Sequence, residues 1–205
     1  MPEFLNFFVV LIIVLDPIGV AWLFAAITHH DSPAQRRVMA IRGVALASVI
    51  LYLFFFAGDA VLHWMGISLP AFRIAGGILL FLLSLEMVFA RQSGLRSTTR
   101  GEQNEAEHKQ DVSVFPLAFP LLAGPGAITT IILMAAQVQT ITERLVYIAV
   151  ILSVCLLTLV TLLLSQRLSS LLGQTGSNVV SRLLGLLLSA LAVQFVLDGI
   201  HQSFF

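Results

Sequence analysis

The residues with the clearest potential for chemistry interrupt long apolar runs. In the stretch IIVLDPIGVAWL, residues 12–23, Asp16 and Pro17 are followed by Gly19, and Asp16 is the one charged residue of the run. Proline lacks the amide hydrogen that a helix interior needs, but it suits the first position of a helix, where a preceding aspartate acts as N-cap. The stretch therefore predicts a helix that breaks at Asp16 and starts again at Pro17.

A second interruption, FPLAFPLLAGPGAITT at residues 115–130, contains three prolines and no ionisable residue. Its two glycines let a ligand approach the main chain closely. A helix that restarts there exposes free amide hydrogens at the positive end of its dipole, which attracts anions. The pattern predicts a second broken helix with an anion-binding start at Gly124, Pro125, Gly126, Ala127 and Thr129.

Together the two interruptions suit a small zwitterion. Its carboxylate would lie on the helix starts, and its ammonium group would lie near Asp16 or near exposed carbonyl groups. Asp16 is also a candidate carrier of a coupling proton, because burial in a membrane disfavours a charged side chain. The alternative is that Asp16 only caps its own half-helix. The predicted substrate-binding residues are Asp16, Pro17, Gly19, Gly124, Pro125, Gly126, Ala127 and Thr129.

These residues belong to a strongly apolar chain. Of its 205 residues, 58% are apolar and 11% are charged, and the mean hydropathy is +0.97. The apolar runs are long enough to cross a hydrocarbon layer of ~30 Å as helices of about 20 residues. We predict an all-α membrane protein of six transmembrane helices, with helices 1 and 4 broken near the midplane. The predicted spans are 4–28, 40–62, 70–90, 114–137, 145–165 and 179–200.

Basic residues are distributed unevenly between the predicted loops. Nine of the eleven Lys and Arg residues lie in or beside loops 1, 3 and 5, and only Arg73 and Arg144 lie on the other side. The positive-inside rule therefore predicts a multi-pass protein of the cytoplasmic (inner) membrane with both termini outside the cytoplasm. Re-entrant hairpins in place of spans 1 and 4 give a similar charge balance, so that alternative stays open.

The chain divides into two similar halves within one integral membrane domain. Aligning Pro17 with Pro125 gives an offset of 108 residues, and aligning the Arg-x-x-Gly patterns at Arg73 and Arg182 gives an offset of 109. Two copies of a three-span unit insert with opposite orientations, which predicts an inverted repeat of the kind found in secondary transporters. The units are repeat one at 1–91, a flexible cytoplasmic linker at 92–112 and repeat two at 113–205.

Charged residues near the span ends have two interpretations. Arg73, Arg182 and Asp198 lie where long side chains can reach the membrane surface. We expect either structural ion pairs, such as Arg73 with Asp59 or Asp198, or a role in coupling and gating. The candidates for coupling and gating are Asp16, Arg73, Arg182 and Asp198.

Other chemistries have weak signals. The sequence His-His-Asp at 29–31 is a poor metal site, because consecutive histidines diverge on a helix, and Asp31 or Ser32 is expected to cap span 2. The single cysteine, Cys155, excludes an intramolecular disulfide. Nucleotide-binding and hydrolase motifs are absent from the sequence. We expect no metal, no other cofactor, no nucleic acid and no enzymatic activity.

Four motifs carry a resemblance to a known family: LDPIG in span 1, FRIAGGILLF in span 3, FPLAFPLLAGPGAITTII in span 4 and SRLLGLLLSALAVQ in span 6. With them, the chain resembles the MarC family, also described as the six-span neutral amino acid transporter family, over essentially its whole length. The resemblance implies a multi-pass cytoplasmic-membrane protein. Some members of that family transport small neutral amino acids such as glycine or alanine.

We therefore predict a secondary active transporter of small neutral amino acids, working by alternating access and coupled to a proton or sodium ion. The alternative is an exporter or flippase of drug-like or lipid-linked substrates, which predicts a large, laterally open apolar cavity. A membrane-embedded enzyme would need a catalytic partner for Asp16, and none is obvious. The expected partners are the amino acid, the coupling ion and the lipid bilayer, and a homo-oligomer is left open.

Overall fold

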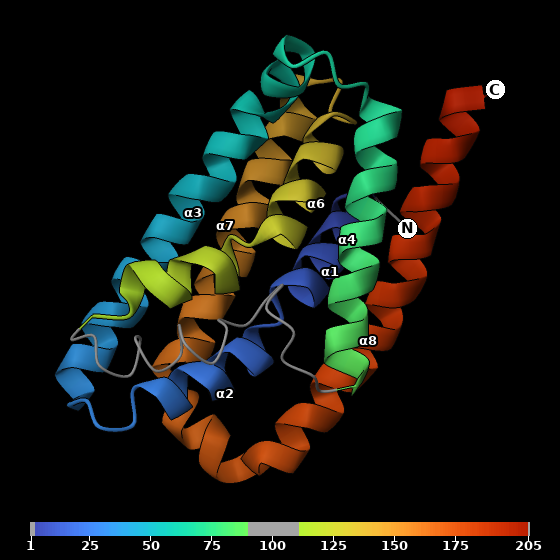
Figure 1. Ribbon diagram of the computed structural model, residues 1–205. Helices are drawn as coiled ribbons and strands as arrows, with labels where there is room; N and C mark the ends of the chain where they lie inside the picture. Colours follow the sequence, from blue (N-terminus) through green and yellow to red (C-terminus); the bar gives the residue numbers. More distant parts are fainter. Residues whose placement is uncertain (1–2, 90–110, 205) are drawn as a thin grey trace.

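The computed structural model describes residues 3–89 and 111–204, and every regular element in these two ranges is helical (Figure 1). The prediction of an all-α fold is confirmed for this part of the chain. The predicted linker lies almost wholly outside the described residues. The elements are α1 Glu3–Leu15, α2 Pro17–Ile27, α3 Pro33–Trp64, α4 Leu69–Phe89, η1 Ser113–Leu122, α6 Pro125–Ala135, α7 Ile141–Leu163 and α8 Ser165–Phe204.

Within residues 3–89 and 111–204, the candidate membrane-crossing segments number five or six. Five stretches are long and apolar enough to cross a membrane, and the sixth candidate is the pair η1 and α6, which bends by 54° at its break. The predicted six spans are reached only if this bent pair crosses as one unit. The five stretches are Phe4–Ile27, Pro33–Trp64, Leu69–Phe89, Ile141–Leu163 and Gly173–Phe204.

Two predicted boundaries were wrong by seven residues or more. α3 begins at Pro33, seven residues before the expected start, because Ser32 and Gln35 form a reciprocal capping box and Pro33 occupies the first helical turn. The expected cap at Ser32 is thereby confirmed. The predicted loop at 166–178 is largely helical, and α8 bends there at Gly173, whose φ of 59° favours glycine.

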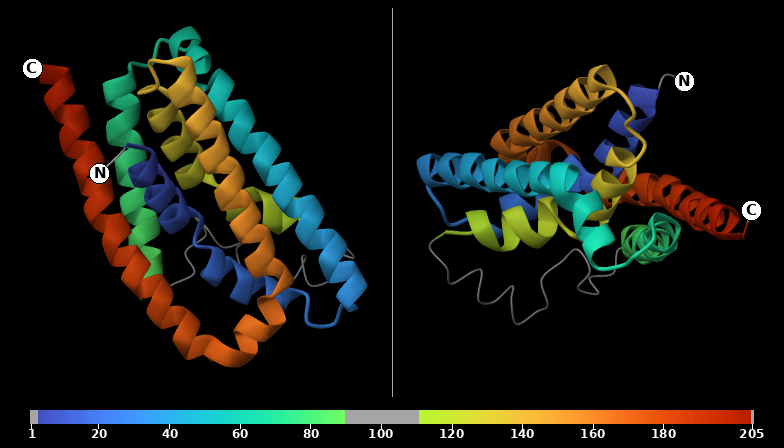
Figure 2. Two further views of the ribbon diagram at one scale, coloured as in Figure 1. Left: turned by 180° about the vertical axis from the view of Figure 1, so that it is seen from behind. Right: turned by 90° about the horizontal axis from the view of Figure 1, so that it is seen from above.

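The broken segments of each half pack on helices of the other half. α1 and α2 contact α7 and α8, whereas η1 and α6 contact α3 and α4. α4 and α8 lie side by side along most of their length (Figures 1 and 2). A Cβ atom at Gly77 would lie 2.8 Å from the Ala192 carbonyl oxygen, and one at Gly185 would lie 3.1 Å from that of Ser84. The glycines therefore allow the two helices to pack closely.

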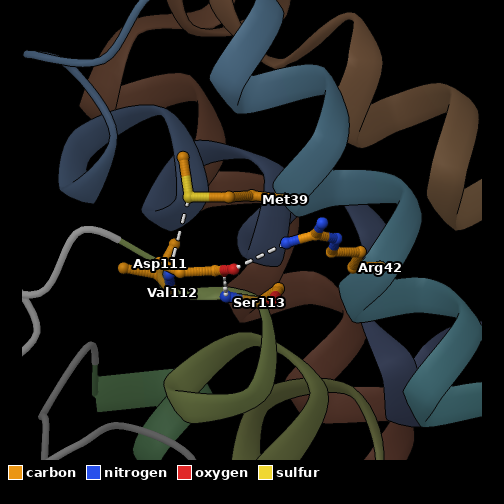
Figure 3. A network of polar contacts seen from close by, with 5 residues as sticks. All are labelled: Met39, Arg42, Asp111, Val112 and Ser113. Atoms are coloured by element: carbon orange, nitrogen blue, oxygen red, sulfur yellow. Dashed lines mark hydrogen bonds and ion pairs between the residues drawn. The ribbon is translucent and has the colours of Figure 1, made fainter.

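η1 is an irregular helical segment that is anchored at its start (Figure 3). The Asp111 carboxylate accepts a hydrogen bond of 2.9 Å from the Ser113 amide and pairs with the Arg42 guanidinium of α3 at 3.2 Å. The hydrogen bonds from Ser113, helped by Arg42, hold the pKa of Asp111 below its usual value. This contact fixes the entry of the chain into its second broken segment.

Candidate functional site

The first break is at Asp16, between α1 and α2. Asp16 has φ 43° and ψ 67°, a left-handed conformation in which aspartate is one of the tolerated residues. Its Oδ1 accepts a hydrogen bond of 3.0 Å from the Gly19 amide. The predicted break and the predicted N-cap are both confirmed. The Gly19 amide, predicted to bind a carboxylate, already donates to a carboxylate of the chain itself.

A residue far along the chain completes the first break. Ser181 on α8 donates a hydrogen bond of 3.0 Å to Asp16 Oδ2, and Asp16 is only 3% exposed. A Cβ at Gly19 would collide with the Asp16 carboxylate and would approach Ser181 Oγ to 2.9 Å. Gly19 is therefore required for this arrangement. Sequence analysis missed Ser181, because a serine 165 residues away carries no local signal.

The second break begins at Gly124, which precedes α6 in an extended conformation, and no described side chain caps it. Gly124, Gly126 and Ala127 are buried, and Pro125 has no amide hydrogen to offer. A Cβ at Gly124 would collide with the Pro120 carbonyl oxygen, so only glycine fits there. The first amides of a helix have no partner within the helix, and they need water, a side chain or a ligand. α6 thus starts with buried amide groups that no side chain satisfies.

A small pocket lies at the start of α6. It has about 20 Å³ open to the centre of a water-sized sphere, enough for about one water molecule and too little for an amino acid. Four of the predicted binding residues line it, together with Val14 from the last turn of α1 and with Leu79 and Leu83 of α4. The predicted members that the structure brings together are Gly124, Pro125, Gly126 and Ala127.

The other predicted binding residues face elsewhere. Thr129 is buried, but its methyl group lies against Gly76 of α4, and Thr129 is not among the residues that line the pocket. Asp16 and Pro17 lie just beyond Val14 on the chain, yet the Asp16 carboxylate points toward Gly19 and Ser181. The lining by Val14 shows that the two breaks are neighbours, although their polar groups face different helices.

The candidates for coupling and gating do not form one cluster. Arg73 is 6% exposed, and its Nε has no hydrogen-bond partner in the described ranges. The expected ion pair of Arg73 with Asp59 or Asp198 is therefore wrong for these ranges, where Asp198 instead accepts a hydrogen bond of 2.7 Å from Gln194. Arg182 is exposed.

Arg73 and Asp16 lie at different depths of the bundle. Gly77, one turn after Arg73, packs on Ala192 of α8, whereas Asp16 contacts Ser181 of the same helix. Ser181 and Ala192 are 11 positions apart (192 minus 181), which is roughly 17 Å along a helix. Direct contact between the two charged groups is therefore excluded in this conformation.

Metal-binding geometry is not found in the described part of the chain, where no three His, Cys, Asp or Glu side chains come together. His29 and His30 have ring centroids 3.5 Å apart, so they contact each other. Cys155 is a buried free thiol. The polar groups at the two breaks include main-chain amides, the Asp16 carboxylate and the hydroxyls of Ser181 and Thr130, and such groups suit binding by hydrogen bonds and charge.

Comparison with known proteins identifies the family. A family model described as MarC family integral membrane protein matches residues 1–204. The chain belongs to the MarC family. Its MarC relatives include a UPF0056 membrane protein of Aquifex aeolicus, 34% identical over 97% of this chain and 92% of that protein. A UPF0056 membrane protein (YhcE) and a UPF0056 inner membrane protein (YhgN) of Escherichia coli are 32% and 35% identical, covering 99% and 98% of this chain and 94% and 98% of their own lengths.

Membership in the MarC family makes the chain a multi-pass integral membrane protein, in agreement with its apolar helices. The name of YhgN places that relative in the inner membrane. The names of these MarC relatives specify no substrate. No solved structure matches the chain.

Proposed function

We propose that this MarC protein is a secondary transporter of small neutral amino acids, with the substrate site at the start of α6. The observation that carries the proposal is the start of α6, where Gly124, Gly126 and Ala127 are buried, line a pocket and have no side-chain cap for their amide groups. A carboxylate satisfies such groups by hydrogen bonding and by interaction with the helix dipole. The space beside the glycines and Ala127 is small, so the ligand must have a small group next to its carboxylate.

The end of α1 supplies the complementary charge. Val14 belongs to the last turn of α1 and lines the same pocket as Gly126, and Val14 Cγ1 would lie 3.7 Å from a Cβ at Gly126. The carbonyl groups at a helix C-terminus form the negative end of its dipole. A zwitterion between the two ends would direct its carboxylate to α6 and its ammonium group to the carbonyl groups of α1.

Transport requires this small pocket to widen and to open in turn to each side of the membrane. The reciprocal packing of the two halves, with each broken segment on helices of the other half, supports the inverted repeat that alternating access uses. Two contacts between α4 and α8 support it too: Gly77 with Val196, and Gly185 with Met87. Adding 109 to Gly77 and subtracting 109 from Val196 gives positions 186 and 87, so the repeat offset converts the first contact into the second to within one residue. Opening would separate α6 from α1 and α4, and Asp16 is the proposed carrier of the coupling proton. We place loops 1, 3 and 5 in the cytoplasm.

The test is uptake of radiolabelled glycine or alanine into proteoliposomes that contain the purified chain. Imposed proton and sodium gradients are compared with no gradient, and protein-free liposomes are the blank. We expect uptake that depends on the protein and on one of the two gradients. Absence of uptake for every neutral amino acid tested, with correctly folded and inserted protein, would refute the proposal.

Two variants locate the site. Gly126→Ala adds a methyl group to the pocket, about 3 Å from the ends of Leu80 and Leu83, and is expected to lower uptake about tenfold or more, since space for one water is all the pocket has. Ala75→Val, which adds bulk on the exposed side of α4, is the control and should leave uptake unchanged. Equal effects of the two variants would place the substrate elsewhere.

A further inference from the structure

A second pocket lies away from both breaks, at the end of the bundle where several arginines gather. It has a volume of about 710 Å³ and lies between the first turn of α3 and the junction of α7 with α8. Figure 1 shows these segments together at the end of the molecule where α2 runs into α3. The volume is within the range of about 300–1,000 Å³ that is typical of ligand sites.

Three arginines line this pocket, from two regions of the sequence. Arg36 and Arg37 come from α3, and Arg167 comes from the start of α8. Arg36 Nη1 is buried and has no hydrogen-bond partner among residues 3–89 and 111–204. The one ion pair between residues of these ranges uses Arg42 and Asp111, so Asp31 and the other described carboxylates leave the three arginines unneutralised. Of the three, only Arg36 has a buried guanidinium nitrogen, whereas Arg37 and Arg167 are exposed at the rim of the pocket. A buried charged donor without an acceptor is unfavourable, and the three like charges repel one another, which indicates that an anionic ligand completes the pocket.

The remaining wall is apolar. Leu162, Leu163 and Leu164 line the same pocket, and the last two are more than 40% exposed. α7 is a membrane-crossing helix that ends at Leu163, so the leucines and arginines meet where the apolar span gives way to the polar end. A phospholipid has this same order of groups, with a phosphate above acyl chains. A soluble phosphate would leave the leucines uncovered.

We propose that this pocket binds the headgroup of an anionic phospholipid, with its phosphate on Arg36, Arg37 and Arg167 and its acyl chains along Leu163 and Leu164. Basic pockets between membrane helices on the cytoplasmic side bind such headgroups in other proteins, and this end is the one that the distribution of basic residues predicts to be cytoplasmic. The proposal is independent of what the protein transports.

The experiment measures lipid binding to the full-length protein in detergent by native mass spectrometry. Phosphatidylglycerol is compared with phosphatidylcholine, which has the same chains and no net charge. We expect at least tenfold tighter binding of phosphatidylglycerol, because both lipids offer a phosphate to the arginines but the three positive charges repel the choline cation of phosphatidylcholine. Equal binding of the two lipids would overturn the proposal.

Variants and a soluble competitor give the remaining outcomes. The triple variant Arg36→Gln, Arg37→Gln and Arg167→Gln should weaken phosphatidylglycerol binding about tenfold, whereas Arg144→Gln, an exposed arginine at the other end, should not. If the triple variant does not fold, Arg36→Gln and Arg36→Lys are compared, and lysine should restore only part of the affinity. Loss with Arg144→Gln as well, or displacement of the lipid by an equal concentration of glycerol 3-phosphate, would contradict a lipid site here.

Discussion

At the first break, α2 starts with an aspartate whose carboxylate accepts hydrogen bonds from Gly19 and Ser181; at the second, α6 starts with Gly124, which has no side chain to offer. Asp16 and Gly124 are both buried, and each is followed by a proline at the first helical position, of which Pro17 is buried and Pro125 is exposed. Both helices restart at a proline, but a side chain caps the start of α2 and no described side chain caps the start of α6.

The difference in capping indicates that the first break serves stability and that the second is available for binding. A helix start that is capped by its own carboxylate needs nothing further, and its contact with α8 ties the first half to the second. An uncapped start is a cost to folding unless water or a ligand satisfies it. We therefore assign the structural role to Asp16 as it stands in this conformation and the ligand role to the start of α6. A proton-carrying role for Asp16 requires the Ser181 contact to be released.

The largest expected effect tests the closed break. Asp16→Ala removes the acceptor for Gly19 and Ser181 and leaves alanine in a left-handed conformation, and it should destabilise the protein by about 2–4 kcal/mol. Asp16→Asn keeps an oxygen for Gly19, its amide group can donate to Ser181, and asparagine tolerates the same backbone. The measurement is unfolding by SDS titration in mixed micelles. Equal losses for both variants would mean that charge, not capping, stabilises this break.

Asp16→Asn also tests coupling in the transport assay. If Asp16 carries the proton, uptake by the variant loses its dependence on the proton gradient while the protein stays folded. An unchanged rate and an unchanged pH profile would leave Asp16 with the capping role alone.

A smaller effect comes from adding the same methyl group at each break. Gly19→Ala places Cβ against the Asp16 carboxylate, which cannot move without losing two hydrogen bonds, and should destabilise the protein by about 1–3 kcal/mol. The methyl group of Gly126→Ala meets the ends of Leu80 and Leu83 at 3.1 and 3.0 Å, and its 3.7 Å contact with Val14 is an ordinary van der Waals distance. Those ends can shift slightly, and alanine favours a helix over glycine by about 1 kcal/mol, so the net change should be small. Thermal unfolding in detergent compares them, and the reverse order would contradict the assignment of roles.

The sequence was sufficient to locate both breaks, because proline and its preceding residue act within one helical turn. α1 ends at Leu15 and α2 begins at Pro17, and α6 begins at Pro125, as predicted. The contact of Asp16 with Ser181 was not predictable, since it depends on how α8 packs against α2. The direction of Thr129 toward Gly76 likewise depends on packing with α4.

At the start of α8, composition is a poor guide to secondary structure. The stretch SQRLSSLLGQTGSN, residues 165–178, is rich in serine, glutamine and glycine, which suggested a loop. In the structure it is helical on both sides of Gly173. A helix at the end of the bundle is not surrounded by lipid, so many of its side chains can be polar. Its composition therefore resembles that of a loop. This misjudged segment carries Arg167, one of the three arginines in the second pocket.

The smallest effect concerns what precedes the open break. Asp111→Asn keeps an acceptor for Ser113 but loses the charge that pairs with Arg42, and the exposed pair should be worth only about 0.2–1 kcal/mol. Because the pKa of Asp111 is lowered in the folded state, its contribution is fully present above the ordinary value of about 3.9 and is lost as the pH falls through the lowered pKa. Unfolding of the two proteins is compared at neutral pH and near pH ~3. The difference between them should shrink in acid, and a difference as large as that for Asp16→Ala would mean that the entry of η1, not the capped break, is the stronger constraint on the fold.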